Sequence, residues 1–335
     1  MTTEPLIDGY GRVHRDLRIS VTDRCNFRCT YCMPAEGMKW LPRSELLTFE
    51  EITRVARVCV EVLGIDSIRL TGGEPTVRAH LPVLVGRLAE LQSGGRPVDL
   101  AMTTNGVTLR HVAGDLRDAG LRRINVSLDT LRPDRFHELT RRDQLPAVLD
   151  GIDAAVEAGF DPVKVNTVVM RGVNDDEVLE LATFGRERGV TVRFIEWMPL
   201  DAGNTWENGA VVGQDEIVAA IHAVHPVDPV VRGSAPAERF VYRDGQGEVG
   251  VIASVTRPFC GSCDRIRLTA DGQLRSCLFS VDEVDLRALL RSGASDDDLA
   301  VAVRACVADK WAGHLIGQVT FVRPRRSMRD RKSHV

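Results

Sequence analysis

Residues 19–32 read ISVTDRCNFRCTYC, and this stretch decides how the rest of the chain is interpreted. It begins as a short β-branched run and ends in three cysteines, Cys25, Cys29 and Cys32, spaced as Cys-x3-Cys-x2-Cys. Three thiolates on one short loop can hold three irons of a cubane iron–sulfur cluster. The fourth iron would have no protein ligand, so a substrate or cofactor could bind to it directly.

The composition is that of an ordinary soluble globular protein. The chain has 335 residues, 44% hydrophobic and 27% charged, with a net charge of −4. This charge gives no whole-protein attraction to nucleic acid or to acidic membranes, so an anionic substrate would need a local basic cluster. The first residues lack a signal-peptide pattern, and no stretch has the length of a transmembrane helix. We therefore expect a cytoplasmic protein without nucleic-acid or membrane partners.

A second cysteine triad lies near the other end of the chain, at Cys260, Cys263 and Cys277. Clustered cysteines in a chain without a signal peptide favour metal binding over disulfides. Structural zinc usually takes four ligands, and the sequence shows no clear fourth ligand; His314 is distant and stands in a helical pattern. The remaining two cysteines, Cys59 and Cys306, lie alone in apolar helical patterns and are predicted to be small buried hydrophobes.

The first two hundred residues alternate between Val- and Ile-rich runs and segments of helical period. We expect strands at 17–22, 66–71, 98–103, 123–128, 163–169 and 191–196, with helices near 50–63, 79–92, 109–119, 144–158 and 175–188. Thr48 and Glu51 form a capping box for the first helix. This alternation predicts parallel strands joined by right-handed crossovers, although periodicity alone leaves a flat doubly wound sheet possible.

Polar and glycine-rich segments follow several of these strands. Gly72-Gly73-Glu74-Pro75, residues 103–106 and residues 127–129 each come after a strand, as does the first cysteine loop. A (β/α) barrel builds its active site at the carboxyl ends of its strands. The sequence thus predicts an α/β fold, a partial (β/α)6 TIM-like barrel over residues 1–212 that carries the first cluster.

The pattern changes in residues 213–335, which we expect to form a second region. Short strand-like runs occur at 227–231, 239–243 and 248–252, followed by the second triad and a charged tail at 323–335. An open barrel leaves two exposed edges that need cover. We expect this region to cover the barrel opening.

The first cysteine loop and the downstream Gly-Gly-Glu-Pro resemble the radical S-adenosylmethionine (radical SAM) superfamily. The second triad, with Arg265 and Arg267 between Cys263 and Cys277, narrows the resemblance to the GTP 3′,8-cyclase family, from about Leu17 to Met328. The resemblance implies an enzyme that cyclises GTP to 3′,8-cyclo-7,8-dihydroguanosine 5′-triphosphate, the first step of molybdenum cofactor biosynthesis. It also implies two [4Fe-4S] clusters facing one cavity, and S-adenosylmethionine as cofactor.

The resemblance assigns roles residue by residue. The six clustered cysteines would hold the metal, and S-adenosylmethionine would contact Tyr31, Gly72, Gly73, Glu74, Ser127 and Met198. GTP would contact Arg18, Arg69, Thr103, Lys164, Arg193, Arg265, Ile266 and Arg267, of which Arg18, Arg265 and Arg267 are also expected to be catalytic. A triphosphate independently requires several Arg or Lys donors in a confined site.

The resemblance also implies partners for this protein. The family implies an external low-potential electron donor and delivery of the product to cyclic pyranopterin monophosphate synthase, with a monomer or homodimer as the working unit.

This chain departs from the family pattern at several positions. Family members end in Gly-Gly, whereas this chain has no glycine after Gly317; Ser67 and Asp264 replace a common Lys and Asn. A divergent paralogue that cleaves S-adenosylmethionine but cyclises GTP poorly is therefore an alternative. A zinc-stabilised binding protein without catalysis is a third.

Overall fold

A computed structural model describes residues 4–34, 38–200, 206–233, 235–314 and 316. The predicted tail at 323–335, and with it the missing Gly-Gly terminus, lies outside these residues. Six parallel strands pair in sequence order, as predicted. They are β1 (Asp16–Ser20), β2 (Ser67–Thr71), β5 (Asp99–Thr104), β6 (Arg123–Ser127), β7 (Val163–Val169) and β8 (Thr191–Glu196).

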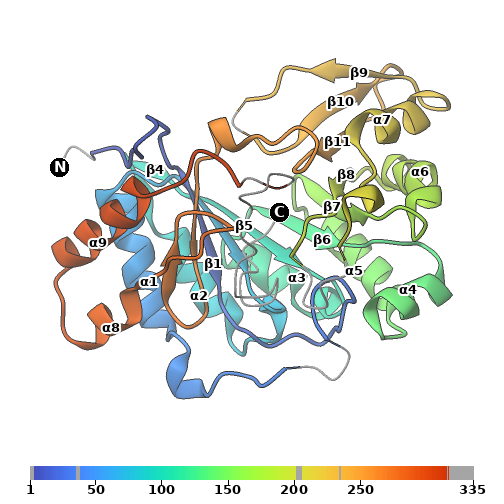
Figure 1. Cartoon of the computed structure of the whole chain (residues 1–335). Coiled ribbons are helices and arrows are strands. Elements are labelled where there is room, and N and C mark those ends of the chain that lie inside the picture. The colour runs from blue at the N-terminus through green and yellow to red at the C-terminus, as the bar shows by residue number, and fades with distance from the viewer. Residues whose placement is uncertain (1–3, 35–37, 201–205, 234, 315, 317–335) are drawn as a thin grey trace.

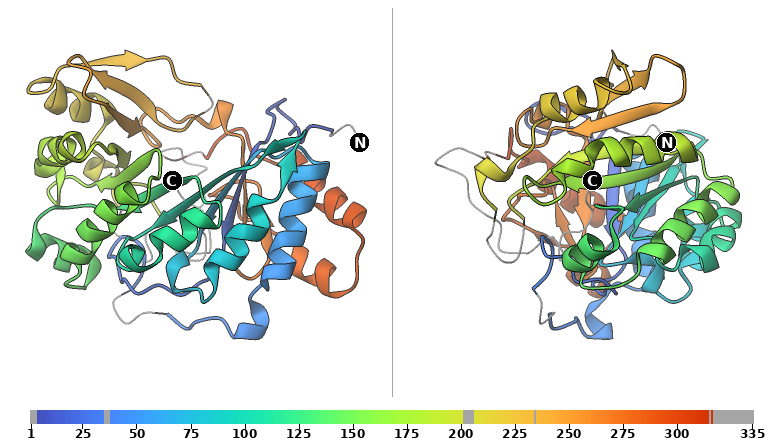
Figure 2. Two further views of the ribbon diagram at one scale, coloured as in Figure 1. Left: turned by 180° about the vertical axis from the view of Figure 1, so that it is seen from behind. Right: turned by 90° about the vertical axis from the view of Figure 1, so that its right-hand side faces the viewer.

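Helices pack along the outside of these strands (Figures 1 and 2). They are α1 (Phe49–Arg57), α2 (Leu81–Ala89), α3 (Leu109–Asp118), α4 (Pro133–Thr140), α5 (Leu145–Glu157) and α6 (Val178–Arg188), with short helices η1 (Arg43–Glu45), η3 (Pro75–Val77) and η4 (Asp175–Glu177) and a hairpin of β3 (Gln92–Ser93) and β4 (Arg96–Pro97). The predicted capping box of Thr48 and Glu51 is present. The first helix differs from the prediction: it changes at Val58 into a π-helical turn, η2 (Val58–Val62).

The C-terminal region adds strands to both edges of the barrel. β12 (Arg265–Leu268) pairs parallel with β1, and β11 (Glu248–Ile252) pairs parallel with β8. Beyond them lie β13 (Gln273–Arg275) and β14 (Val284–Asp285) on one side, and β10 (Glu238–Tyr242) and β9 (Val227–Val230) on the other. The result is one open 12-stranded sheet (Figure 1). Both exposed barrel edges are thus covered, as expected.

The remaining helices belong to the same region. They are α7 (Gln214–His222), α8 (Leu286–Arg291), α9 (Asp296–Ala308), η5 (Asn208–Ala210) and η6 (Cys260–Ser262). An ion pair of 2.7 Å between Arg54 and Asp296 ties α9 to α1. Cys306 on α9 and Cys59 on η2 are buried, as predicted. Within the described residues, every helix is too short or too polar to cross a membrane.

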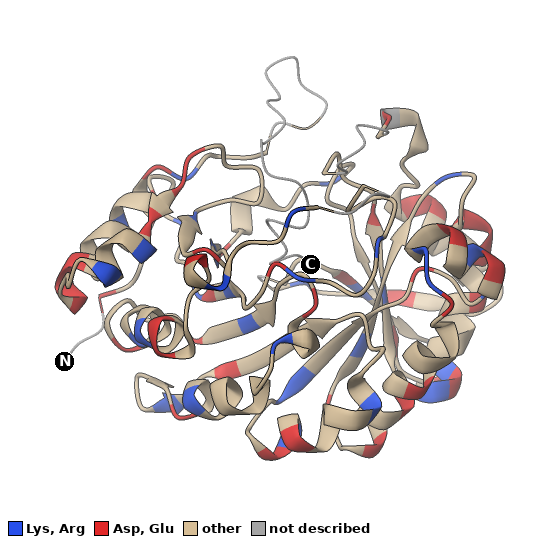
Figure 3. Ribbon diagram, turned by 90° about the horizontal axis from the view of Figure 1, so that it is seen from below, with Lys and Arg blue, Asp and Glu red and all other residues tan. Residues whose placement is uncertain are grey.

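The strand register places basic residues in rows inside the barrel. Arg18 on β1 lies directly beside Arg69 on β2 and Arg267 on β12. Directly paired residues of neighbouring strands point to the same face of the sheet. Figure 3 shows Lys and Arg positions on the strands themselves, not only on the outer helices. The parallel order of the strands therefore builds a concentrated positive charge in the barrel interior.

Candidate active site

The first cysteine loop follows β1 and is buried. Cys25 and Cys29 are each 8% exposed, and Cys32 is 1% exposed. The Phe27 amide donates to Cys25 Sγ at 3.4 Å, and Arg28 donates to the Cys25 carbonyl at 2.7 Å. Amide donors of this kind stabilise thiolate ligands of iron–sulfur clusters. The donor set and its setting fit such a cluster.

The Gly-Gly segment packs directly against this loop. The Gly73 amide donates to the Thr22 carbonyl at 2.7 Å, and the Glu74 amide donates to the Arg24 carbonyl at 2.7 Å. Together with Cys25, Cys29 and Tyr31, residues 72–74 line a first cavity of about 890 Å³ that is open to solvent. The glycines therefore permit a close approach to the cysteine loop itself, in addition to lining the space where a cofactor would bind.

Glu74 is 1% exposed, and its carboxylate is already hydrogen-bonded within the protein. It accepts from the Thr104 hydroxyl at 2.6 Å, from the Asn105 amide at 2.6 Å and from both the amide and the hydroxyl of Thr76. The family resemblance implies that Glu74 contacts S-adenosylmethionine. In the structure, Glu74 joins the end of β2 to the end of β5 and fixes one wall of the cavity.

Tyr31 connects the cysteine loop to the opposite wall. Its hydroxyl donates to Asp129 at 2.5 Å, and burial together with the Asp129 charge raises the pKa of Tyr31 well above its usual value. Asp129 was not among the predicted site residues, although it follows the predicted Ser127 by two positions. Both Ser127 and Asp129 line the first cavity.

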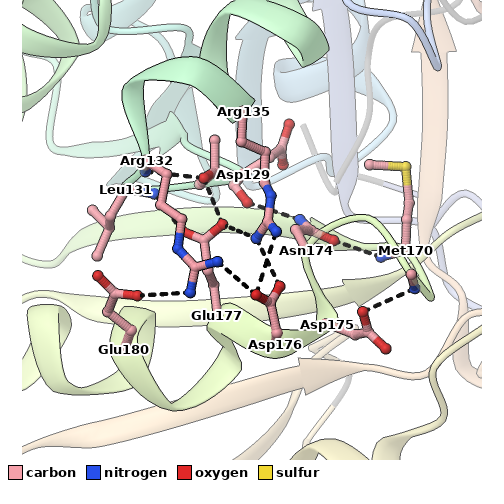
Figure 4. A network of polar contacts seen from close by, with 12 residues as sticks. Asp129, Leu131, Arg132, Arg135, Met170, Asn174, Asp175, Asp176, Glu177 and Glu180 are labelled. Atoms are coloured by element: carbon pink, nitrogen blue, oxygen red, sulfur yellow. Dashed lines mark hydrogen bonds and ion pairs between the residues drawn. The ribbon is translucent and has the colours of Figure 1, made fainter.

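A polar network supports the segment that carries Asp129 (Figure 4). Asn174 donates to the Asp129 carbonyl at 2.7 Å, and the buried Glu177 accepts from the Thr130 hydroxyl at 2.6 Å and from the Leu131 amide at 2.8 Å. Arg135 pairs with the same Glu177 carboxylate. The network fixes the cavity wall that faces Tyr31.

The second triad lines a separate cavity of about 630 Å³, also open to solvent. Cys260, Cys263 and Cys277 all line it, with Arg265, Arg267 and Phe279 among their neighbours. Each triad thus lines a space of its own, and the expectation that both clusters face one cavity stays a prediction. Met198, expected beside S-adenosylmethionine, lines the second cavity.

His314 also lines the second cavity, which corrects its predicted helical setting. α9 ends at Ala308, so His314 lies in the segment beyond it. Its Nε2 donates to the Ser254 carbonyl at 2.8 Å, and its Nδ1 accepts from the Ile316 amide at 3.1 Å. Because backbone groups occupy both ring nitrogens, His314 does not offer a nitrogen to a metal in this arrangement.

The second triad is strongly positive in its surroundings. Burial raises the pKa of the Cys263 thiol, but Arg265 and Lys310 outweigh it and lower that pKa to about 6. Burial raises the pKa of Cys260. Since the thiolate is the form that binds metal, the setting of Cys263 favours ligation. The Phe279 amide donates to Cys277 Sγ at 3.5 Å, which adds a donor to another ligand.

The predicted GTP contacts form a basic cluster in the barrel interior. Arg18 is fully buried and lies 3.4 Å from Asp16, whose pKa is lowered because Arg18 and Arg69 outweigh the effect of burial. Nε and Nη1 of Arg69 are buried without a hydrogen-bond partner in the part of the chain that the structure describes. A buried guanidinium in this state is suited to an incoming anion.

Arg193 on β8 and Lys164 on β7 add to the basic charge of the barrel interior. Arg193 donates to Asn166 at 2.7 Å and to Asn125 at 2.9 Å, and Asn125 also donates to the Thr103 hydroxyl at 3.2 Å. Burial, followed by the charge of Arg193, lowers the pKa of Lys164 to about 8. Both Thr103 and Asn166 line the first cavity, so this part of the cluster adjoins it.

Ile266 is the predicted GTP contact whose side chain lies elsewhere. It is 0% exposed and packs in the hydrophobic core, whereas Arg265 and Arg267 on either side line the second cavity. Alternate residues of a strand point to opposite faces. Ile266 can therefore meet a ligand only through its backbone.

Neither triad is arranged as a site for a single metal ion. Among the described residues, no three His, Cys, Asp or Glu side chains converge to hold one ion. A cubane cluster binds its thiolates at separate corners, so its ligands lie further apart than those of one zinc ion.

Comparison with solved structures supports the fold. The chain resembles SuiB of Streptococcus suis, solved bound to S-adenosylmethionine, with a TM-score of 0.61 and 14% sequence identity, over 88% of this chain and 69% of that chain. At this identity the similarity concerns the fold alone.

Relatives found by sequence are far more similar to this chain. The model of the radical SAM superfamily matches residues 19–185, and that of Molybdenum Cofactor Synthesis C matches residues 190–316. The chain is 52% identical over 326 residues to a GTP 3′,8-cyclase of Streptomyces coelicolor, covering 96% of this chain and 95% of the relative. It is 49% identical over 333 residues to GTP 3′,8-cyclase 2 of Mycobacterium tuberculosis, covering 98% and 92%. The chain belongs to the GTP 3′,8-cyclase family of the radical SAM superfamily.

Proposed function

We propose that this protein is a GTP 3′,8-cyclase that converts GTP to 3′,8-cyclo-7,8-dihydroguanosine 5′-triphosphate, the first step of molybdenum cofactor biosynthesis. The observation that carries the proposal is the buried basic cluster of the barrel interior. Some of its residues line the second cysteine-lined cavity, and others contact residues that line the first. Relatives that are about half identical over nearly their whole length carry the same name. They lend no support to the divergent-paralogue alternative.

The first triad, Cys25, Cys29 and Cys32, would hold a [4Fe-4S] cluster. S-adenosylmethionine would occupy the first cavity, against Tyr31, Gly72, Gly73 and Ser127. The chemistry supplied there is one-electron reduction of S-adenosylmethionine, which creates the species that removes a hydrogen atom from the substrate. The protein's own part is to hold these groups rigidly, through Glu74 on one wall and the Tyr31–Asp129 hydrogen bond on the other.

The second triad would hold a second [4Fe-4S] cluster with one iron open to the substrate. His314 would not serve as a fourth protein ligand, because backbone groups engage both of its ring nitrogens. The purine base of GTP would then enter the second cavity, between the triad and Phe259. Arg265 and Arg267, which line this cavity, would lie beside the reacting nucleotide.

The triphosphate would bind to the basic cluster. Arg69 has buried donors to offer, Arg18 lies beside it, and Arg267 lies on the far side of Arg18 in the same row. Lys164 and Arg193 would add charge from β7 and β8. Several cations in one confined space suit a ligand with multiple phosphate charges. The electron would come from an external low-potential donor, and the product would pass to cyclic pyranopterin monophosphate synthase, with the protein acting as a monomer or homodimer.

The proposal is tested with anaerobically reconstituted full-length protein, S-adenosylmethionine, GTP and dithionite. We expect 5′-deoxyadenosine and the cyclised nucleotide to form together, and both to be lost in Cys25→Ala. Formation of 5′-deoxyadenosine without cyclised nucleotide would support the divergent paralogue, and a Gly-Gly-ended tail grafted after Met328 would show whether the terminus is responsible. A colourless protein that holds zinc and no iron would exclude both enzymatic readings.

A further inference from the structure

Lys310 is a buried cation that the proposed reaction does not use. It is 3% exposed, follows the end of α9 and does not line either cavity. A buried lysine is costly unless its ammonium group is hydrogen-bonded or paired. The partners of its ammonium group therefore show how the cost of burying Lys310 is offset.

The Lys310 ammonium group points into the second cysteine loop. Its Nζ donates to the carbonyls of Cys263 at 3.2 Å and Arg265 at 2.9 Å, and lies 3.6 Å from Cys263 Sγ. One side chain thus fixes the backbone on both sides of Asp264 and also contacts a predicted cluster ligand. Lys310 touches the ligand and not the cavity, so it is a positioning residue.

The hydrogen bonds of His14 indicate that Lys310 is a charged ammonium ion. The two nitrogens His14 Nε2 and Lys310 Nζ lie 2.8 Å apart, and His14 Nδ1 lies 3.1 Å from the Arg12 carbonyl. A carbonyl only accepts, so Nδ1 carries the proton and Nε2 accepts from Lys310. Burial, followed by the charge of Lys310, lowers the pKa of His14 to about 4, which agrees with a neutral ring. With His14 and two carbonyls as acceptors, Lys310 needs all three hydrogens of an ammonium ion.

The segment around His14 holds the other end of the same loop. Arg12 donates to the Cys260 carbonyl at 2.7 Å and to the Trp311 carbonyl at 2.7 Å, while its Nε donates to the buried Asp8 at 2.6 Å. The N-terminal segment therefore clamps the second cysteine loop and the segment after α9 together. Lys310 is fixed by contacts on several sides.

We propose that Lys310 positions the second cysteine loop and places a positive charge close to the Cys263 sulfur, which raises the reduction potential of the second cluster. This inference rests on the proposed second cluster. A cluster becomes more negative on reduction, so a cation close to a ligand sulfur stabilises the reduced state. Removing this charge makes the cluster harder to reduce.

The test measures the midpoint potential of the second cluster in the full-length reconstituted protein by redox titration followed by electron paramagnetic resonance. The signal that disappears in Cys263→Ala is assigned to the second triad. Lys310→Met removes both the charge and the donor, and Lys310→Gln keeps a polar group without charge. Arg304→Met is the matched control, because Arg304 lies on α9 and pairs at the surface with Glu4.

We expect the potential to shift to more negative values in both Lys310 variants, with wild-type potential in Arg304→Met and an unchanged first-cluster signal throughout. Selective loss of iron from the second triad in both variants would equally support the positioning role. Wild-type potential and iron content in both Lys310 variants would overturn the inference while leaving the second cluster intact. A wild-type spectrum that Cys263→Ala leaves unchanged would instead refute the proposed second cluster.

Discussion

Gly73 and Arg24 are in such close contact that a Cβ atom on Gly73 would lie 2.1 Å from the Arg24 carbonyl oxygen. The obstacle is backbone, and Arg24 immediately precedes Cys25. The absence of a side chain at Gly73 is therefore what lets the loop after β2 pack against the first cysteine loop. Cofactor binding and cluster geometry are coupled through this contact.

Gly73→Ala should displace the first cysteine loop. We expect loss of about half of the iron, because one of the two proposed clusters would lose its ligand geometry, together with loss of 5′-deoxyadenosine formation. Iron analysis and the uncoupled cleavage assay check this. Gly114→Ala is the control: Gly114 lies on α3 with open space around its Cα, so alanine there should be neutral or stabilising by up to ~1 kcal/mol. Normal iron content in Gly73→Ala would contradict the account.

Arg69→Met should weaken GTP binding without weakening the fold. Loss of one charged hydrogen-bonding group costs about 1.5–3 kcal/mol, so the Kd for GTP should rise about 10- to 100-fold in calorimetric titration. Burial lowers the pKa of Arg69, so burial disfavours its charged form. The free energy of unfolding should therefore stay the same or rise. Arg87→Met, at an exposed pair with Glu50, should leave the Kd unchanged. An unchanged Kd in Arg69→Met would remove Arg69 from the binding site.

The two kinds of cysteine should respond differently to removal. Cys277→Ala should eliminate the second cluster and GTP cyclisation but retain cleavage of S-adenosylmethionine, as seen by iron content and 5′-deoxyadenosine yield. Cys306→Ala is the matched control, because burial raises the pKa of that thiol to about 11 and keeps it protonated. Equal loss of iron in the two variants would mean that the second triad is not a cluster site.

GTP affinity should decline at alkaline pH through Lys164. The pKa of Lys164 is lowered to about 8, and only the ammonium form attracts phosphate, so a bound triphosphate should raise this pKa again. The Kd should be nearly constant below pH 8 and increase above it, approaching about tenfold per pH unit. In Lys164→Arg the charge persists, and this increase should disappear between pH 7 and 9. The same pH dependence in Lys164→Arg would assign it to another group.

The sequence could predict the central strands because each is an apolar run between polar turns. It gave no bounds for α4, α7, α8 or α9. It did place Cys306 in a helical pattern, and the capping box of Ser295 and Asp298 was a usable signal for the start of α9. It could not reveal that β12 pairs with β1, because that register depends on packing between segments far apart in the chain. Such pairing has no local pattern to read.

The residues of the candidate site likewise divide into those that the sequence could predict and those that it could not. The cysteines, the glycines and the interior arginines could be recognised from spacing and from charge within apolar strands. Asp129, His14 and Lys310 could not, because each acquires its role from a partner on a distant segment. Glu74 was predicted as a site residue, but its hydrogen bonds to Thr104 and Asn105 depend on how β2 and β5 lie together.

The most direct test of the proposed cyclase uses GTP deuterated at the 3′ carbon. The wild-type protein, incubated anaerobically with S-adenosylmethionine and a reductant, should transfer that deuterium into 5′-deoxyadenosine, which mass spectrometry detects alongside the cyclised nucleotide. This result would place the ribose of GTP next to the activated cofactor. Unlabelled 5′-deoxyadenosine, formed without cyclised nucleotide, would contradict the assignment of GTP as the substrate.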